Sequence, residues 1–85
     1  MKITVEYFAQ LRTTAEIDRE QFVLPEGATV HDLVAAIRSR HHGLLGESEA
    51  IPGWVTIVVR EQAITPDHPL ADGDVVRFLA PISGG

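Results

Sequence analysis

The chain has 85 residues, 45% of them hydrophobic, which is enough for one small domain with one core and leaves no room for a second domain. Twelve acidic against seven basic residues give a net charge of −5 with no basic run, which excludes nucleic acid as an expected partner. The absence of cysteine excludes disulfides, thiolate nucleophiles and sulfur-ligated metals. A core must therefore come from packing alone, which favours a carrier or binding role over a self-contained enzyme.

Membrane and export signals are not found in the sequence. The longest mostly apolar run, residues 54–59, is far shorter than the about 20 residues of a membrane-spanning helix. Residues 1–20 lack the basic start and apolar block of a signal peptide. We therefore expect a cytoplasmic protein with no membrane partner.

The first predicted strand covers residues 2–8, where apolar and polar side chains alternate. This pattern breaks over residues 9–17. A second strand is predicted over residues 21–24 and stops at the Pro-Glu-Gly turn of residues 25–27. The two strands are expected to pair as a hairpin.

A helix is predicted to follow Thr29, because Thr29 is a suitable N-cap and Asp32 stands three residues later, as in a variant of the capping box. The helix is expected to bury one apolar stripe with spacing i, i+3, i+4 and i+7, formed by Val30, Leu33, Val34 and Ile37. Gly43 is predicted to end it as the C′ residue.

The second half of the chain starts with a polar loop over residues 44–53. Residues 54–60 are the best candidate for a buried central strand, and residues 63–64 form at most a short strand. A turn region over residues 67–74 then leads into a last strand over residues 75–79.

This order of elements predicts an α+β domain over residues 1–79, with a mixed sheet of about five strands and one main helix on one face. Residues 80–85 are expected to be a flexible tail. Because a single helix covers only one face of the sheet, apolar residues on the other face near the tail, such as Leu79, are expected to be exposed.

The tail ends in Gly84-Gly85. Glycine has no Cβ, so a diglycine end can enter a channel too narrow for other residues, and the carboxyl group of Gly85 becomes the candidate reactive group. Chain ends are often disordered whatever their composition, so an inert tail on a binding module is the alternative.

Three segments carry a resemblance to a known family. They are Tyr-Phe-Ala-Gln-Leu-Arg at 7–12, Asp-His-Pro-Leu-Ala-Asp-Gly-Asp at 67–74 and Pro-Ile-Ser-Gly-Gly at 81–85. With these segments the chain resembles the ubiquitin-like β-grasp sulfur carriers, and within them the small subunits of molybdopterin synthase, over essentially its whole length. The chain departs from the family pattern at two places. It has Arg60 where an asparagine is common, and a single proline, Pro81, preceded by Ala80, where the family often has two prolines.

The resemblance implies a chemistry for Gly85. An E1-like activating enzyme would adenylate its carboxyl group with ATP, and a sulfur donor system would convert the glycyl adenylate into a thiocarboxylate, 1-thioglycine. The sulfur would then pass to cyclic pyranopterin monophosphate to form the dithiolene of molybdopterin, in molybdenum cofactor biosynthesis. The chain itself would bind no cofactor and contribute no catalytic residue.

The resemblance also implies partners. The tail would insert into the large catalytic subunit of molybdopterin synthase, in a heterotetramer of two small and two large subunits. The inserted residues would be Pro81, Ile82, Ser83 and Gly84. The candidate interface around the tail comprises Phe8, Arg12, Phe78 and Leu79.

Several alternatives stay open at this point. The chain could carry sulfur for the thiazole of thiamine or another pathway, or could be a ubiquitin-like protein modifier that ends in an isopeptide bond. A metal site built from the four histidines is disfavoured, because their spacing lacks supporting cysteine or carboxylate ligands. Asp72 and Asp74 are expected to be solvated turn residues.

Overall fold

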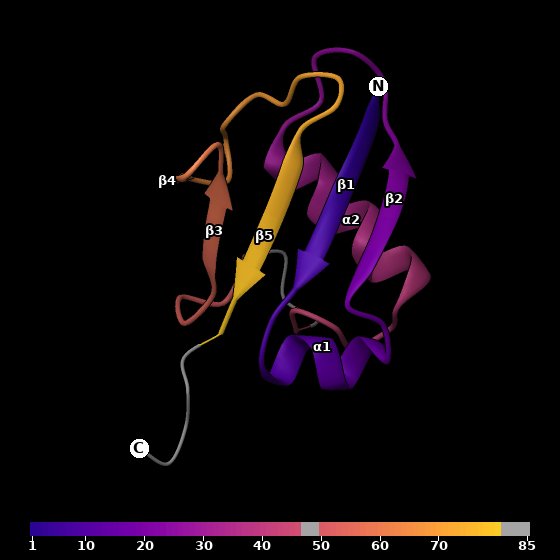
Figure 1. Ribbon diagram of the computed structural model, residues 1–85, viewed down its shortest axis with the longest axis vertical. Coiled ribbons are helices and arrows are strands. Elements are labelled where there is room, and N and C mark those ends of the chain that lie inside the picture. Colours follow the sequence, from indigo (N-terminus) through magenta and orange to yellow (C-terminus); the bar gives the residue numbers. More distant parts are fainter. Residues whose placement is uncertain (47–49, 81–85) are drawn as a thin grey trace.

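The computed structural model describes residues 1–46 and 50–80 (Figure 1). Seven elements follow one another in the order β1 (Lys2–Tyr7), α1 (Gln10–Ala15), β2 (Arg19–Val23), α2 (Val30–Arg40), β3 (Thr56–Val59), β4 (Gln62–Ala63) and β5 (Val75–Leu79). Residues 81–85, for which a tail is predicted, lie outside the described residues. No helix in the described part of the chain is both long and apolar enough to cross a membrane.

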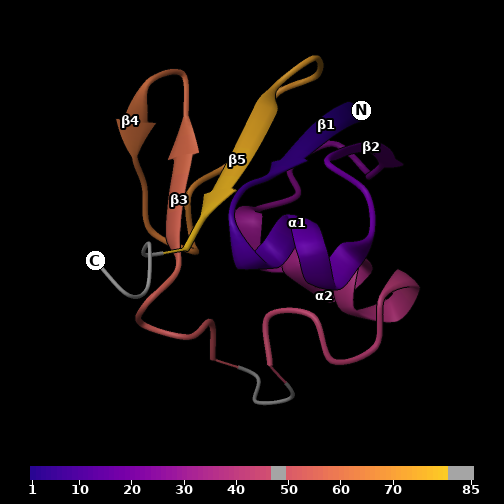
Figure 2. The same ribbon diagram turned by 60° about the horizontal axis from the view of Figure 1, so that its bottom comes forward.

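The five strands form one mixed sheet in the order β2-β1-β5-β3-β4. β1 pairs antiparallel with β2 and parallel with β5, while β3 pairs antiparallel with both β5 and β4. Figure 2 shows both helices on one side of this sheet, and the other side is open. The prediction of a β-grasp fold, with about five strands and one main helix on one face, is confirmed.

The helix α2 has the start and the buried face that the sequence predicts. The Thr29 N–H donates to Oδ2 of Asp32 at 2.8 Å, and the Asp32 N–H donates to Oγ1 of Thr29 at 3.4 Å, which completes a capping box. The predicted apolar stripe is buried against the sheet, with an exposure of 1% or less for Val30, Leu33, Val34 and Ile37. The helix ends earlier than predicted, because His41 is its C-cap and Gly43 therefore lies beyond the C′ position.

The central strand is β5, so the prediction that residues 54–60 form it is wrong. β3 is the second strand from the edge and covers only four residues, of which Ile57 and Val59 are buried. Trp54 precedes β3 and is 49% exposed. A continuous apolar run is typical of a strand buried on both faces. In β3, however, every second residue faces the open side of the sheet.

Residues 9–17, where the strand pattern breaks, contain the short helix α1. It buries only Leu11 and Ala15, too few positions to show a helical period in the sequence. Its N-cap, Ala9, offers no side-chain cap and has a φ of 56°, and its C-cap, Glu16, has a φ of 59°. Nothing in the side chains at either end therefore predicts where α1 begins or ends.

Candidate functional site

The site begins where the two central strands end. Because β1 and β5 run parallel, their C-terminal ends lie at the same end of the sheet, beside α1 (Figure 1). The Phe8 N–H donates to the carbonyl oxygen of Phe78 at 3.2 Å, which joins the two strands at that point. Ala80, the last described residue, follows β5 here. Ala80 thus follows the middle strand of the sheet, at one end of the domain.

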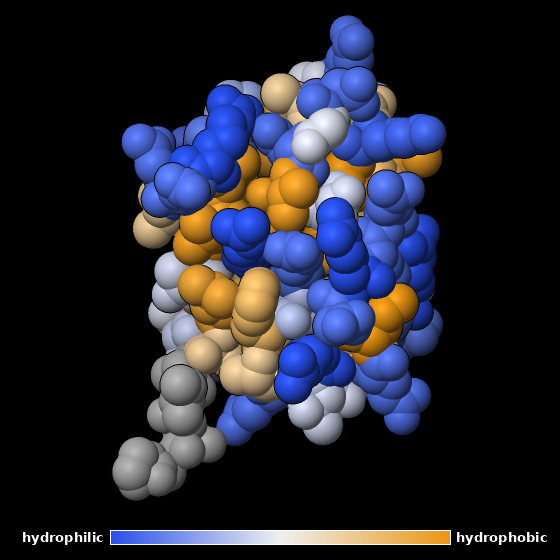
Figure 3. Space-filling model, viewed as in Figure 1, coloured by the Kyte–Doolittle hydropathy of each residue, from blue (hydrophilic) through white to orange (hydrophobic). Residues whose placement is uncertain are grey.

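Phe8, Trp54 and Leu79 are among the apolar side chains that are accessible at this end, and we call these three the tail-base patch. Phe8 is 39% exposed and Trp54 49%, whereas Leu79 is half-buried. Trp54 reaches this end because Thr56, two residues later, pairs with Leu79. Figure 3 shows apolar side chains gathered over β3 and β5 and towards this end, while hydrophilic side chains dominate over β1 and β2. Accessible aromatic side chains of this kind are typical of a protein-protein contact.

The predicted interface residues lie at this end, but one of them is buried. Phe8 and Arg12 are exposed and Leu79 is half-buried, so all three remain available to a partner. Phe78 is wrong as an interface residue, because it is 0% exposed and stacks on Tyr7 with ring centroids 6.3 Å apart. Successive residues of a strand face opposite sides, so Phe78 points to the core and Leu79 to the open face.

Trp54 is the residue of the patch for which the sequence-based prediction is wrong. The apolar run predicts a buried strand, yet Trp54 follows Pro52-Gly53 and lies in a turn before β3. The Pro-Gly pair directly before it was the available signal, since such a pair marks a turn rather than the interior of a strand.

A depression of about 230 Å³ lies next to the patch. It is lined by Glu6, Tyr7, Phe8, Arg12, Asp18 and Arg19. Arg19 lies 3.8 Å from Glu6, whereas Arg12 has no ion-pair partner among residues 1–46 and 50–80. Arg12 therefore presents an exposed positive charge beside the apolar patch, suited to a carboxylate or phosphate on a partner.

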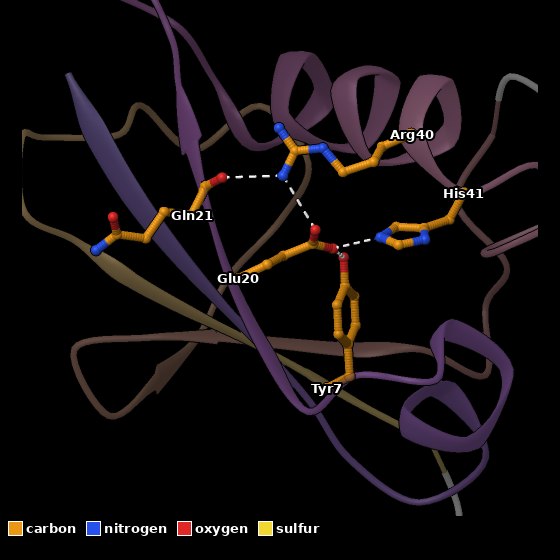
Figure 4. Close-up of polar contacts among 5 residues, drawn as sticks. All are labelled: Tyr7, Glu20, Gln21, Arg40 and His41. Carbon is orange, nitrogen blue, oxygen red and sulfur yellow. Dashed lines mark hydrogen bonds and ion pairs between the residues drawn. The ribbon is translucent and has the colours of Figure 1, made fainter.

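Between β2 and the C-terminal end of α2, a cluster of polar side chains centres on Glu20 (Figure 4). The side chain of Glu20 is 8% exposed and accepts a hydrogen bond from Oη of Tyr7 at 2.5 Å. Nη1 of Arg40 lies 3.0 Å from Oε1 of Glu20, and Nε2 of His41 lies 2.7 Å from Oε2. These contacts join β1, β2 and the C-terminal end of α2.

The protonation states in this cluster follow from burial and hydrogen bonding. Burial alone would raise the pKa of Glu20, but the hydrogen bonds from Tyr7, Arg40 and His41 outweigh it, so the pKa of Glu20 is lowered and the carboxylate is charged. Burial, and then the hydrogen bond to Glu20, raise the pKa of the Tyr7 phenol far above its usual value. Glu20 is thus fully engaged by its neighbours, which suits a supporting role rather than proton transfer.

The described residues do not bring together a metal site. Between residues 1–46 and 50–80, no group of three or more histidine, cysteine, aspartate or glutamate side chains is placed to hold an ion. His41 is bound to Glu20, and the other histidines lie apart from it in sequence or on exposed surface. This end of the molecule offers accessible apolar side chains beside Ala80, the last described residue.

Comparison with known proteins gives this surface a context. Residues 5–85 match the ThiS family. The chain belongs to the ThiS family. It is 32% identical to the molybdopterin synthase sulfur carrier subunit of Chlamydomonas reinhardtii, with 100% of both chains covered. It is 33% identical to the subunit of the same name from Escherichia coli, with 98% of this chain and 99% of the relative covered.

Solved structures agree with the fold of this ThiS-family chain. A candidate molybdopterin converting factor, subunit 1, from Pyrococcus furiosus has a TM-score of 0.78 at 38% identity, covering 96% of this chain and 99% of the other. SAMP1 from Haloferax volcanii has a TM-score of 0.90 at 21% identity, with both chains fully covered, and so supports the fold alone. The same holds for a complex of subunits 1 and 2 of molybdopterin-converting factor from Helicobacter pylori, where the TM-score is 0.64 at 24% identity and both chains are fully covered.

Proposed function

We propose that this chain is the sulfur-carrier subunit of a molybdopterin synthase, and that the carboxyl group of Gly85 is the group that carries the sulfur. The full-length match to two carrier subunits of that name carries the proposal. The geometry supports it, because the residues that precede the predicted tail leave the domain at its centre, beside accessible apolar side chains and the exposed Arg12.

The chemistry requires activation from outside. An ionised α-carboxyl group, with a pKa of about 3.5, is a poor electrophile because its carbonyl carbon is electron-rich. Attack of the Gly85 carboxylate on the α-phosphate of ATP, on an E1-like enzyme, would release pyrophosphate and give an acyl adenylate. A sulfur donor would then displace AMP and leave a thiocarboxylate.

The thiocarboxylate sulfur is a soft nucleophile. We propose that it attacks a carbon atom of cyclic pyranopterin monophosphate, and that water then cleaves the resulting thioester, which leaves the sulfur on the pterin and returns Gly85 to the carboxylate form. A dithiolene contains two sulfur atoms, so two charged carriers are consumed for each pterin. These steps change only the carboxyl group of Gly85 and require no chemical change in the rest of the domain.

A large subunit should supply the rest of the active site. Glu20, the most enclosed carboxylate at the tail end, is already bound by three neighbours, so general acid and base groups for the reaction are expected on the partner. The net charge of −5 likewise points to a partner that binds the phosphate of the pterin. The two carrier subunits that this chain matches over its full length are each named as one subunit of a synthase, which supports an assembly with a second subunit.

Intact-mass analysis tests the carrier step. The protein is incubated with an E1-like activating enzyme, ATP and a sulfur donor, and the expected product has one oxygen at Gly85 replaced by sulfur. A variant lacking Gly85 is the matched control and should gain no sulfur. Failure of the full chain to form the thiocarboxylate with several activating enzymes would contradict the proposal.

Co-purification tests the choice of pathway. The proposed function predicts that the large subunit of molybdopterin synthase is retained by the tagged chain, in a ratio of one to one. Retention of a thiazole-forming enzyme instead would assign the chain to thiamine synthesis. Branched peptides that join Gly85 to lysine side chains would show a protein modifier.

A further inference from the structure

The strand β2 is an open edge of the sheet, on the side away from β3 and β4. In its antiparallel ladder with β1, the pair Met1 and Leu24 exchanges hydrogen bonds of 2.7 and 2.9 Å, and the Tyr7 N–H donates to the Asp18 carbonyl at 2.9 Å. Such pairs alternate along an antiparallel ladder, so the backbone groups of the residues between them point outward. Those residues are Arg19, Gln21 and Val23.

A groove runs between this edge and α2. It has a volume of about 510 Å³ and is lined by Gln21, Phe22, Val23, Ala36, Ser39 and Arg40. Its strand wall carries outward backbone groups, and Val23 at one end is 80% exposed. A groove beside an open strand edge fits an added β-strand, because the backbone supplies hydrogen bonds and every second side chain of the ligand enters the groove.

The charge of the groove selects the kind of strand. Arg40 lies over the Phe22 ring with its Cζ 3.9 Å from the centroid, and its Nη1 donates to the Gln21 carbonyl at 3.0 Å. The side chain of Arg40 is 49% exposed and that of Arg19 is 63% exposed. Arg40 thus presents an accessible guanidinium group in the groove beside its ion pair with Glu20 at 3.0 Å, whereas Arg19 lies outside the groove, 3.8 Å from Glu6. A carboxylate is the complementary group, because guanidinium binds it with two parallel hydrogen bonds.

We propose that the β2 edge binds an extended apolar segment of a partner protein, with a carboxylate side chain that meets Arg40. The arriving strand would donate an N–H to the Gln21 carbonyl in place of Arg40, which frees one N–H of Nη1 for the carboxylate while the other still donates to Glu20. This site lies on the opposite edge of the sheet from β4 and does not depend on the carrier chemistry of the tail.

A second copy of this chain is the less suitable occupant. Pairing two β2 edges would bring two Arg40 side chains into one seam, and the nearby carboxylate of Glu20 is already bound to Tyr7, Arg40 and His41. Like charges without free acceptors oppose such a dimer. An acidic partner strand removes the same repulsion.

The test is a titration of the ¹⁵N-labelled protein with the peptide acetyl-Thr-Val-Thr-Val-Thr-Glu-Thr-amide, in which both valines and the glutamate share one face. We expect a Kd on the order of 100 µM, as for a small peptide interface. The largest shifts should fall on the amides of Gln21 and Val23, whose hydrogen exchange should slow on binding. A peptide with lysine in place of glutamate should bind at least fivefold more weakly.

Two variants separate the site from a general effect on the fold. Val23→Pro removes an outward N–H and should abolish binding, since edge strands tolerate proline. Arg40→Gln should erase the preference for glutamate over lysine, a ratio that a merely structural role of Arg40 would not change. Arg12→Gln removes an exposed charge outside the groove and should leave both affinities unchanged. Equal binding of the two peptides by the unaltered protein, shifts elsewhere, or dimerisation through Gln21 and Val23 would each overturn the proposal.

Discussion

The two ends of the central strand pair β1 and β5 are finished in different ways. At the end away from the tail, backbone and carboxylate groups hold the turn over residues 71–74 to β1: the Gly73 N–H donates to the Lys2 carbonyl at 2.8 Å, and the Lys2 N–H donates to Oδ1 of Asp72 at 2.7 Å. At the tail end, the apolar side chains of the tail-base patch are accessible within residues 1–46 and 50–80. One end is closed by hydrogen bonds, and the other presents a contact surface.

Asp74 shows how strongly the turn end is tied. Its side chain is 8% exposed and accepts two hydrogen bonds from Arg60, at 3.1 and 2.9 Å, and one from the Ala71 N–H at 2.8 Å. The expectation that Asp74 is a solvated residue is therefore wrong. The contrast implies that substitutions at the turn end should change stability, whereas substitutions at the tail end should change binding.

The largest effect is expected from removal of both aromatic side chains at the tail end, in the double variant Phe8→Ala/Trp54→Ala. Affinity for the large subunit of the proposed synthase should fall about 100-fold, because aromatic side chains in the centre of an interface carry much of its binding energy. The free energy of unfolding should fall by no more than about 1 kcal/mol, since both side chains are accessible. Titration calorimetry and urea denaturation measure the two quantities.

Val23→Ala is the matched control for that double variant. Val23 is an exposed apolar residue at the end of β2 that lies away from the tail. It should leave the affinity for the large subunit unchanged. An unchanged affinity in the double variant would show that the tail-base patch is not an interface.

The next largest effect is expected from Asp74→Ala, which should lower the free energy of unfolding by about 2 kcal/mol. It removes two charge-assisted hydrogen bonds and leaves the Ala71 N–H without its acceptor. Affinity for the large subunit should not change. A loss of affinity without a loss of stability would reverse the assignment of the two ends.

The same variant has a predicted pH dependence. The hydrogen bonds from Arg60 lower the pKa of Asp74, against the opposing effect of burial, with a further contribution from the Ala71 N–H. A lowered pKa in the folded state means that Asp74 stabilises the fold above its unfolded pKa of about 3.9, and that this stabilisation is lost as the pH falls through the folded pKa. Urea denaturation between pH 7 and pH 3 should therefore show a smaller acid-induced loss in Asp74→Ala.

A smaller effect is expected from Glu20→Gln, which tests the contribution of the polar cluster around Glu20 to stability. The free energy of unfolding should fall by about 1 kcal/mol, because the amide keeps one acceptor for Tyr7 but loses the charge that faces Arg40. The pKa of Glu20 is lowered in the fold, so its stabilisation is also lost as the pH falls, and the variant should be less sensitive to acid below about pH 4. An equal acid sensitivity in both proteins would contradict this view of the cluster.

Periodic features of the sequence predicted much of the fold. Alternation predicted β1, and the spacing of Val30, Leu33, Val34 and Ile37 predicted the buried face of α2, because each pattern reflects burial on one side of a regular element. The tail and two further segments led to the family by resemblance. The position of β3 in the sheet could not be predicted, because the order of strands depends on long-range pairing.

Backbone conformation was the other feature that the sequence concealed. The β3-β4 hairpin turns through Arg60 and Glu61, both with positive φ, where asparagine and glycine are the usual residues. Arg60 occupies this position while its side chain binds Asp74, a pairing between residues 14 positions apart that no local pattern indicates. Where the family commonly has an asparagine, this chain thus has an arginine whose side chain donates hydrogen bonds to Asp74. Ala9, at the tail end, has the same kind of strained backbone without such a pairing.

Ala9→Gly should therefore raise the free energy of unfolding by about 0.5–1 kcal/mol. Ala9 has φ 56° and ψ −129°, and the Leu11 N–H donates to the Phe8 carbonyl at 3.2 Å, which together make a type II′ turn that favours glycine at this position. Ala35→Gly is the matched control, because the same change on the exposed side of α2 should lower the free energy of unfolding by about 1 kcal/mol. Opposite signs in urea denaturation would show that the tail end holds a strained turn directly after Phe8. A lower free energy of unfolding in Ala9→Gly would contradict a strained turn at this position.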